Sequence, residues 1–97
     1  MPITLEISSH AQQRLIERFN VRAEDIRALV LENLKDAIFY KQAPNRRLII
    51  GGLFVMCVNI DGEGNHWIVA TVMEEKPFYF NPGKPRDCRG DFELKMA

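Results

Sequence analysis

The chain has 97 residues, of which 46% are hydrophobic and 27% are charged. This length and composition suit one globular domain with a single modest core and exclude a disordered or low-complexity chain. Lys and Arg total 13, as do Asp and Glu, so any surface for nucleic acid requires positive charge that is locally separated from negative charge. Since there is no membrane-length apolar stretch and no secretory pattern at the start, we expect a cytoplasmic protein that does not enter membranes.

A short strand is the first predicted element. Residues 3–7 alternate between apolar and polar side chains, which is typical of a strand with one buried face. The inward side chains are expected to be Ile3, Leu5 and Ile7. Ser8 and Ser9 follow, and either hydroxyl can cap the first turn of a helix.

The first helix is predicted over residues 9–19. Asn20 comes next, and asparagine tolerates the left-handed backbone conformation that ends many helices. Apolar residues at every fourth position form a stripe expected to be buried: Ala11, Leu15 and Phe19. A neighbouring stripe repeats with the same spacing: His10, Arg14 and Arg18.

A second helix is predicted from Arg22, as its cap position, to about Lys35. Val21 and Ile26 have the spacing of a hydrophobic staple across the first turn of this helix. The expected buried stripe is Ile26, Leu29, Val30 and Leu34. Asn33 is expected to point outward.

The pattern then becomes strand-like, in segments 37–41, 46–50, 53–60 and 66–73. The last two segments are apolar on both faces, which indicates a sheet covered on both sides or covered by a partner. The predicted fold is therefore α+β, with a short N-terminal strand and two helices packed on a three- to four-stranded antiparallel meander.

Residues 1–76 are predicted to form the single domain, and residues 77–97 a tail with at most an edge strand at 78–80. Three of the five prolines lie in this tail. Cys57 is expected to be an inert thiol in an apolar strand, whereas Cys88 lies among charged residues of the tail. The cysteines and histidines lack metal-ligand spacing, so we expect no metal and no other cofactor.

The stripe of His10, Arg14 and Arg18 is the most distinctive candidate site. Histidine transfers protons near neutral pH, and arginine binds phosphate oxygens through two parallel hydrogen bonds. This spacing therefore indicates phosphodiester chemistry. The alternative is structural: the two arginines pair with Glu17 or with acidic residues of the second helix, and His10 caps the first turn.

A second basic cluster surrounds the predicted turn at 44–45. Arg46 or Arg47 reaches the same cleft if the concave face of the sheet meets the first helix, and Arg46 and Lys41 are candidates for contacts to nucleic acid. The alternative is that these side chains are simply solvated.

Polar candidates also lie on the last predicted strand. His66 precedes Trp67, and such a pair stacks on a nucleobase or else packs across strands. Thr71 and Glu74 are further candidates on this strand.

One segment resembles a known family: Ser9-His10-Ala11-Gln12-Gln13-Arg14-Leu15-Ile16-Glu17-Arg18-Phe19-Asn20-Val21, followed by Glu24-Asp25-Ile26. The chain is similar over about residues 3–76 to small domains of unknown function related to RelE/ParE-type and BrnT-type toxins, within the barnase/EndoU/colicin/RelE-like fold. The family pattern is roughly His-Ala-x-x-Arg, a Glu-Arg pair, a Gly-Ile turn and Glu-Asp-hydrophobic at the second helix. Asn20 replaces the usual glycine, and Arg22 stands where a Ser or Thr cap is expected.

The resemblance implies a metal-independent ribonuclease of a toxin–antitoxin or mobile-element system. RNA or the ribosome is then the target, and an antitoxin is a partner. His10 is expected to transfer the proton, and Arg14, Arg18 and Arg47 to hold the phosphate. The alternative is a non-catalytic module, encoded by a prophage or another mobile element, that binds a protein partner or a second copy of itself through its apolar strand faces.

Overall fold

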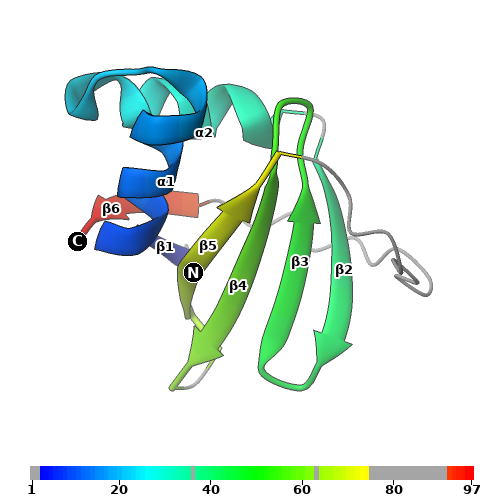
Figure 1. The fold of residues 1–97 in the computed structure, drawn as a ribbon. Helices are drawn as coiled ribbons and strands as arrows, with labels where there is room; N and C mark the ends of the chain where they lie inside the picture. Colours follow the sequence, from blue (N-terminus) through cyan, green and yellow to red (C-terminus); the bar gives the residue numbers. More distant parts are fainter. Residues whose placement is uncertain (1–2, 36, 63, 75–91) are drawn as a thin grey trace.

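The computed structural model describes residues 3–35, 37–62, 64–74 and 92–97. In chain order the elements are β1 (Ile3–Ile7), α1 (Ser9–Phe19), the short 3-10 helix η1 (Ala23–Asp25), α2 (Ile26–Leu34), β2 (Ile38–Ala43), β3 (Arg46–Ile50), β4 (Val55–Asp61), β5 (His66–Met73) and β6 (Phe92–Met96). Figure 1 shows the two helices together at one side of a strongly twisted sheet. The predicted α+β class, with a short N-terminal strand and two helices, is confirmed.

The sheet differs from the prediction in its size and in the direction of two strands. It has six strands in the order β2-β3-β4-β5-β1-β6. Strands β2 to β5 form an antiparallel meander, but β1 runs parallel to β5 and β6 runs parallel to β1. The prediction of a three- to four-stranded antiparallel meander is therefore wrong. Periodicity identifies a strand locally, whereas its partner here lies far away in the chain.

β6 is an edge strand within the segment that was predicted as a tail. Its apolar and charged residues alternate, and Leu94 lies opposite the buried Leu5 of β1. Beyond it, the Ala97 N–H donates to the Ile7 carbonyl at 3.1 Å. The predicted edge strand at 78–80 lies outside the described residues.

α1 begins and ends where the sequence predicts. The Ser8 hydroxyl accepts a hydrogen bond from the Ala11 N–H at 3.1 Å, which satisfies one of the free donors of the first turn. Asn20 adopts the left-handed conformation, with φ 54° and ψ 39°. Ala11 and Leu15 are fully buried, as expected for the apolar stripe.

α2 is reached through η1, and its buried face includes a residue expected outside. Asn33 is fully buried, and its Oδ1 accepts from the backbone N–H groups of Leu53 at 2.8 Å and Phe54 at 2.9 Å. The prediction that Asn33 points outward is wrong because position 33 is seven residues from Ile26, on the same face of a helix. The amide connects α2 to the β3–β4 loop, and a Cβ on Gly51 would overlap it.

Both helices pack on one face of the sheet, where the core lies. Apolar residues from α1, α2 and the central strands form one cluster that contains Leu15, Val30 and Val69. The sheet curls so far that its two edge strands meet through aromatic rings: Phe39 of β2 stacks on Phe92 of β6, with centroids 5.7 Å apart and planes at 3°. The two helices lie near one end of the curled sheet (Figure 1), and one flank of α1 carries the exposed side chains of His10, Gln13 and Glu17.

Candidate functional site

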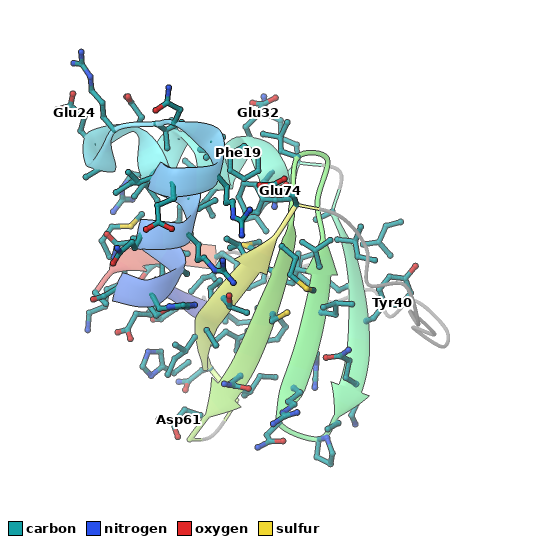
Figure 2. The ribbon with its side chains drawn as sticks, viewed as in Figure 1. Phe19, Glu24, Glu32, Tyr40, Asp61 and Glu74 are labelled. Atoms are coloured by element: carbon teal, nitrogen blue, oxygen red, sulfur yellow. The ribbon has the colours of Figure 1, made fainter. Side chains whose placement is uncertain are left out.

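The polar stripe of α1 lies beside the end of β5. The Ser8 backbone N–H donates to the Val69 carbonyl at 3.3 Å, and the Ser8 hydroxyl donates to the Ala70 carbonyl at 3.2 Å. These bonds place the start of α1 against the middle of β5, and the helix then runs along the second half of this strand. Figure 2 shows Phe19 and Glu74 close together, where the two elements end.

A pocket of about 300 Å³ opens between these two elements, and we call it the α1–β5 pocket. Its lining consists of two guanidiniums, one carboxylate and three apolar side chains: Arg14, Arg18, Glu74, Phe19, Val72 and Met73. The pocket therefore combines positive charge with an apolar wall, a combination suited to an anion that carries a flat or apolar group.

A second, smaller hollow of about 240 Å³ lies along the same helix, lined by His10, Gln13, Arg14 and Glu17. Arg14 belongs to both hollows, so the structure places His10 on one side of this guanidinium and Arg18 on the other. The stripe that the spacing predicts is thus assembled along one flank of α1.

Arg14 is the half-buried member of this stripe. Its Nε atom is shielded from solvent and has no hydrogen-bond partner among the described residues. Glu17, a predicted partner, accepts a hydrogen bond from Gln13 Nε2 at 3.1 Å. A buried donor without an acceptor costs about 1–3 kcal/mol, and more when the group is charged. The guanidinium of Arg14 therefore carries a buried donor that no acceptor among the described residues compensates.

Arg18 contacts an acid, but only loosely. Its Nε lies 3.8 Å from Glu74 Oε1, and the two side chains are 53% and 52% exposed. An exposed ion pair of this length contributes at most about 1 kcal/mol. The acid directly follows β5 rather than lying on the second helix, and both groups remain accessible at the rim of the α1–β5 pocket.

His10 lies in the first turn of α1 and is exposed. The alternative in which His10 caps this turn is not what the structure shows, because the capping oxygen belongs to Ser8. The exposed imidazole shares the smaller hollow with Arg14.

Arg47 lies apart from this stripe and is engaged locally. Its Nη1 donates to the carbonyls of Ala43 and Arg46, each at 2.9 Å, and its guanidinium carbon lies 5.8 Å from the centre of the Trp67 ring. Trp67 is near the start of β5 and Glu74 follows its end, a separation of roughly 20 Å at about 3.3 Å per residue. The structure therefore does not bring Arg47 to the α1–β5 pocket.

Arg46 and Lys41 are exposed near the same β2–β3 turn. In Figure 1 this turn lies at the bottom of the sheet, whereas β5 ends at the top beside α1. These two side chains also lie away from the α1 stripe.

His66 and Trp67 do not form a stacking platform, because adjacent residues of a strand point to opposite faces. Trp67 is buried, donates from Nε1 to the Gly64 carbonyl at 3.0 Å, and packs against Phe39 and Phe92. His66 Nε2 lies 3.6 Å from Glu6 Oε1, and the same oxygen is 3.6 Å from Lys95 Nζ.

Phe19 is the pocket residue that sequence reasoning assigned only to the core. It does pack on the core, with its ring 5.3 Å from that of Phe54 at 56°, but it also lines the α1–β5 pocket. Phe19 ends the apolar stripe and directly follows Arg18, the last residue of the basic stripe, and this position was the available signal. Glu74 was a sequence candidate, and its meeting with Arg18 depends on the tertiary fold.

Cys57 is half-buried, and this burial raises the pKa of its thiol above the usual value, which opposes reactivity. Cys88 lies outside the described residues. In the part of the chain that the structure describes, no group of three or more His, Cys, Asp and Glu side chains is placed to hold a metal ion. Nor does any helix described there have the length and apolarity needed to span a membrane.

Comparison with protein-family models, with curated proteins and with solved structures found no match. The resemblance of residues 9–21 to toxin-related domains therefore stays a prediction, and the function has to be argued from the geometry of the α1–β5 pocket and the adjoining hollow.

Proposed function

We propose that this protein is an RNA-acting domain that binds the phosphates of single-stranded RNA along the exposed flank of α1. The observation that carries the proposal is Arg14, whose guanidinium lines two adjoining hollows while its buried Nε has no acceptor. A phosphate supplies several acceptor oxygens to a guanidinium, and the paired geometry suits arginine better than lysine.

The chain has zero net charge, and His10, Arg14 and Arg18 share one flank of α1. Two carboxylates line the same hollows: Glu17 accepts a hydrogen bond from Gln13, and Glu74 pairs with Arg18, which leaves the guanidinium of Arg14 as the local positive group. Local positive charge is what attracts a phosphate at the short screening lengths of physiological salt.

The proposed reaction is metal-independent cleavage of the RNA backbone. In this reaction His10 accepts the proton of a ribose 2′-hydroxyl, and the 2′-oxygen forms a bond to the adjacent phosphorus. The bond from phosphorus to the 5′-oxygen of the next nucleotide breaks, and that oxygen takes a proton from water. Arg14 stabilises the negative charge that develops on the phosphate oxygens. The products are a 2′,3′-cyclic phosphate and a 5′-hydroxyl end.

The toxin-type role that the resemblance implies belongs to this proposal. In it, the domain cleaves RNA, free or on the ribosome, and a protein partner restrains that activity.

Arg14→Gln tests the binding step. We expect this variant to bind a short fluorescein-labelled RNA at least about tenfold more weakly than the unaltered protein, measured by fluorescence anisotropy at low salt. Arg22→Gln is the matched control: it removes the same charge from an exposed arginine that pairs with Glu24 on η1. Equal losses in the two variants, or no RNA binding by the unaltered protein, would contradict the proposal.

The second candidate function is a non-catalytic module that binds another protein or a second copy of this chain. It is favoured by two large apolar side chains at the same end of the β2–β4 sheet, Ile38 at 44% and Leu53 at 45% exposure. Light scattering distinguishes the two: a dimer that Ile38→Lys dissociates, with no RNA binding, would favour the module.

A further inference from the structure

We infer that the α1–β5 pocket selects guanine, with Glu74 binding the Watson–Crick edge of the base while Arg14 holds a phosphate. This inference rests on the proposed function, since it names the nucleotide that the same site accepts. It starts from the three kinds of side chain in the lining: an apolar wall, two guanidiniums and one carboxylate.

The apolar wall suits a base. Phe19 is half-buried and lines the pocket together with Val72 and Met73. Unstacked bases of single-stranded RNA are bound by stacking on aromatic side chains and by contacts with apolar ones. A volume of about 300 Å³ lies at the lower end of the range for ligand pockets, which limits the occupant to a single base with its phosphate.

The carboxylate supplies the selection among bases. Glu74 is half-exposed at the rim, and its contact with Arg18 is long, so its oxygens are available to a ligand. An ionised carboxylate only accepts hydrogen bonds. Guanine presents two adjacent donors on its Watson–Crick edge, N1–H and N2–H, which match the two oxygens of a carboxylate.

The other bases fit this carboxylate less well. Adenine and cytosine each place a ring-nitrogen acceptor beside their amino group, and uracil flanks its single N–H with two carbonyls. Each of these edges brings a lone pair towards Glu74. A site that forms hydrogen bonds to particular groups rejects ligands that leave its own groups unpaired, so the carboxylate discriminates against these three bases.

Arg14 fixes the other end of the nucleotide, since Arg18 lies 3.8 Å from Glu74 beside the base edge. Arg14 and Arg18 are one helical turn apart on the same flank of α1, about 5–6 Å between their Cβ atoms. Arg14 lines the pocket next to the His10 hollow, so a phosphate held there lies between the base in the α1–β5 pocket and the proposed proton-transfer group. Cleavage is then expected at the phosphate adjacent to guanosine.

The test compares short uridine RNAs that carry one central guanosine, inosine, adenosine or cytidine, together with the all-uridine RNA. We expect the guanosine RNA to bind at least about tenfold more tightly than the adenosine, cytidine and all-uridine RNAs. Inosine keeps N1–H and lacks the 2-amino group, so its affinity is expected to be intermediate. Equal affinity for all five RNAs, with dependence on Arg14, would overturn guanine selection and leave the proposed function standing.

Glu74→Gln tests the role of the carboxylate directly. We expect this variant to lose the guanosine preference while it binds the other RNAs as well as before or better, because Arg18 is released from its acidic neighbour. Glu24→Gln is the control, since it makes the same charge change on η1, and it is expected to keep the preference. A variant that merely misfolds weakens binding to every RNA alike, and a guanosine preference that survives Glu74→Gln would overturn the assignment.

Free nucleotides test whether the pocket binds guanine in a mononucleotide, in RNA or in both. GMP is expected to displace the guanosine RNA, and AMP is not; equal displacement by both would overturn the selection. If GMP binds while no RNA does, the guanine pocket stands and the RNA-acting function fails. If neither RNA nor GMP binds, both proposals fail.

Discussion

Arg14 and Arg47 are both half-buried arginines, yet their guanidiniums differ in the partners that the fold gives them. Arg47 donates to the carbonyls of Ala43 and Arg46 and lies over the ring of Trp67, so its charge and its donors are used within the fold. Arg14 lies on the flank of α1 with a buried Nε that has no acceptor among the described residues. A satisfied arginine stabilises a turn, whereas an unsatisfied one next to a pocket is available to a ligand. This difference, rather than positive charge alone, distinguishes the α1 flank from the β2–β3 turn.

The largest effect is expected from His10→Ala, which removes the side chain that shares the smaller hollow with Arg14. If His10 transfers the proton, its loss lowers the rate of RNA cleavage by about 10²–10⁴-fold while RNA binding changes little. Cleavage is followed by gel electrophoresis, and the 2′,3′-cyclic phosphate ends by mass spectrometry. His66→Ala, which removes the only other histidine of the chain, is the control. Equal cleavage by the two variants would contradict the role of His10.

Asn33→Ala tests a buried amide whose Oδ1 accepts two backbone hydrogen bonds, while its Nδ2 has no partner among the described residues. The change leaves the N–H groups of Leu53 and Phe54 without their acceptor and opens a cavity behind them. At about 1–3 kcal/mol for an unsatisfied donor, we expect the free energy of unfolding to fall by about 2–4 kcal/mol. Urea denaturation followed by circular dichroism measures it. An unchanged denaturation midpoint would show that the connection between α2 and the β3–β4 loop is dispensable.

Arg14→Met and Arg47→Met test directly whether each arginine serves stability or RNA binding. Methionine removes the charge and keeps much of the apolar stem. We expect Arg47→Met to lower the free energy of unfolding by about 1–2 kcal/mol through lost hydrogen bonds and the lost contact with Trp67, with RNA binding retained. Arg14→Met is expected to be neutral for stability or to raise it slightly, and to weaken RNA binding. Thermal denaturation and fluorescence anisotropy of both variants test this, and the reverse pattern would refute the distinction.

The smallest effect on stability is expected from Glu74→Gln. Its ion pair with Arg18 is long and exposed, so the free energy of unfolding is expected to change by less than about 0.5 kcal/mol. Thermal denaturation at low and at high salt checks this value. A loss several times larger would mean that Glu74 is part of the structural framework, and that its proposed contact with guanine needs another basis.

Features encoded by neighbouring residues were predictable from the sequence. The limits of α1, its cap at Ser8 and its end at Asn20 depend on a few adjacent side chains, and each agrees with the structure. The same holds for the bounds of β3 and β5. The stripe of His10, Arg14 and Arg18 also follows from helical spacing alone, which is why half of the candidate site was visible before the fold.

Features that depend on distant pairing were not predictable. β6 alternates as a strand should, but nothing local indicates that it joins β1 in parallel. Asn33 was misplaced because its polarity outweighed its helical position, although two backbone donors compensate its Oδ1 atom. Arg47 was grouped with α1 because the curl of the sheet, which carries the β2–β3 turn away from that helix, is a property of the whole chain.

The central claim is that the guanidinium of Arg14 binds an RNA phosphate, and the most direct measurement follows its Nε–H resonance by NMR. In a ¹⁵N-labelled sample titrated with the guanosine-containing RNA, the Arg14 Nε–H signal, assigned by its loss in Arg14→Lys, is expected to shift until the site is saturated. The Arg47 Nε–H signal is expected to stay in place, since its guanidinium is already held within the fold. An Arg14 signal that does not move at saturating RNA, or one that moves no more than that of Arg47, would contradict the account.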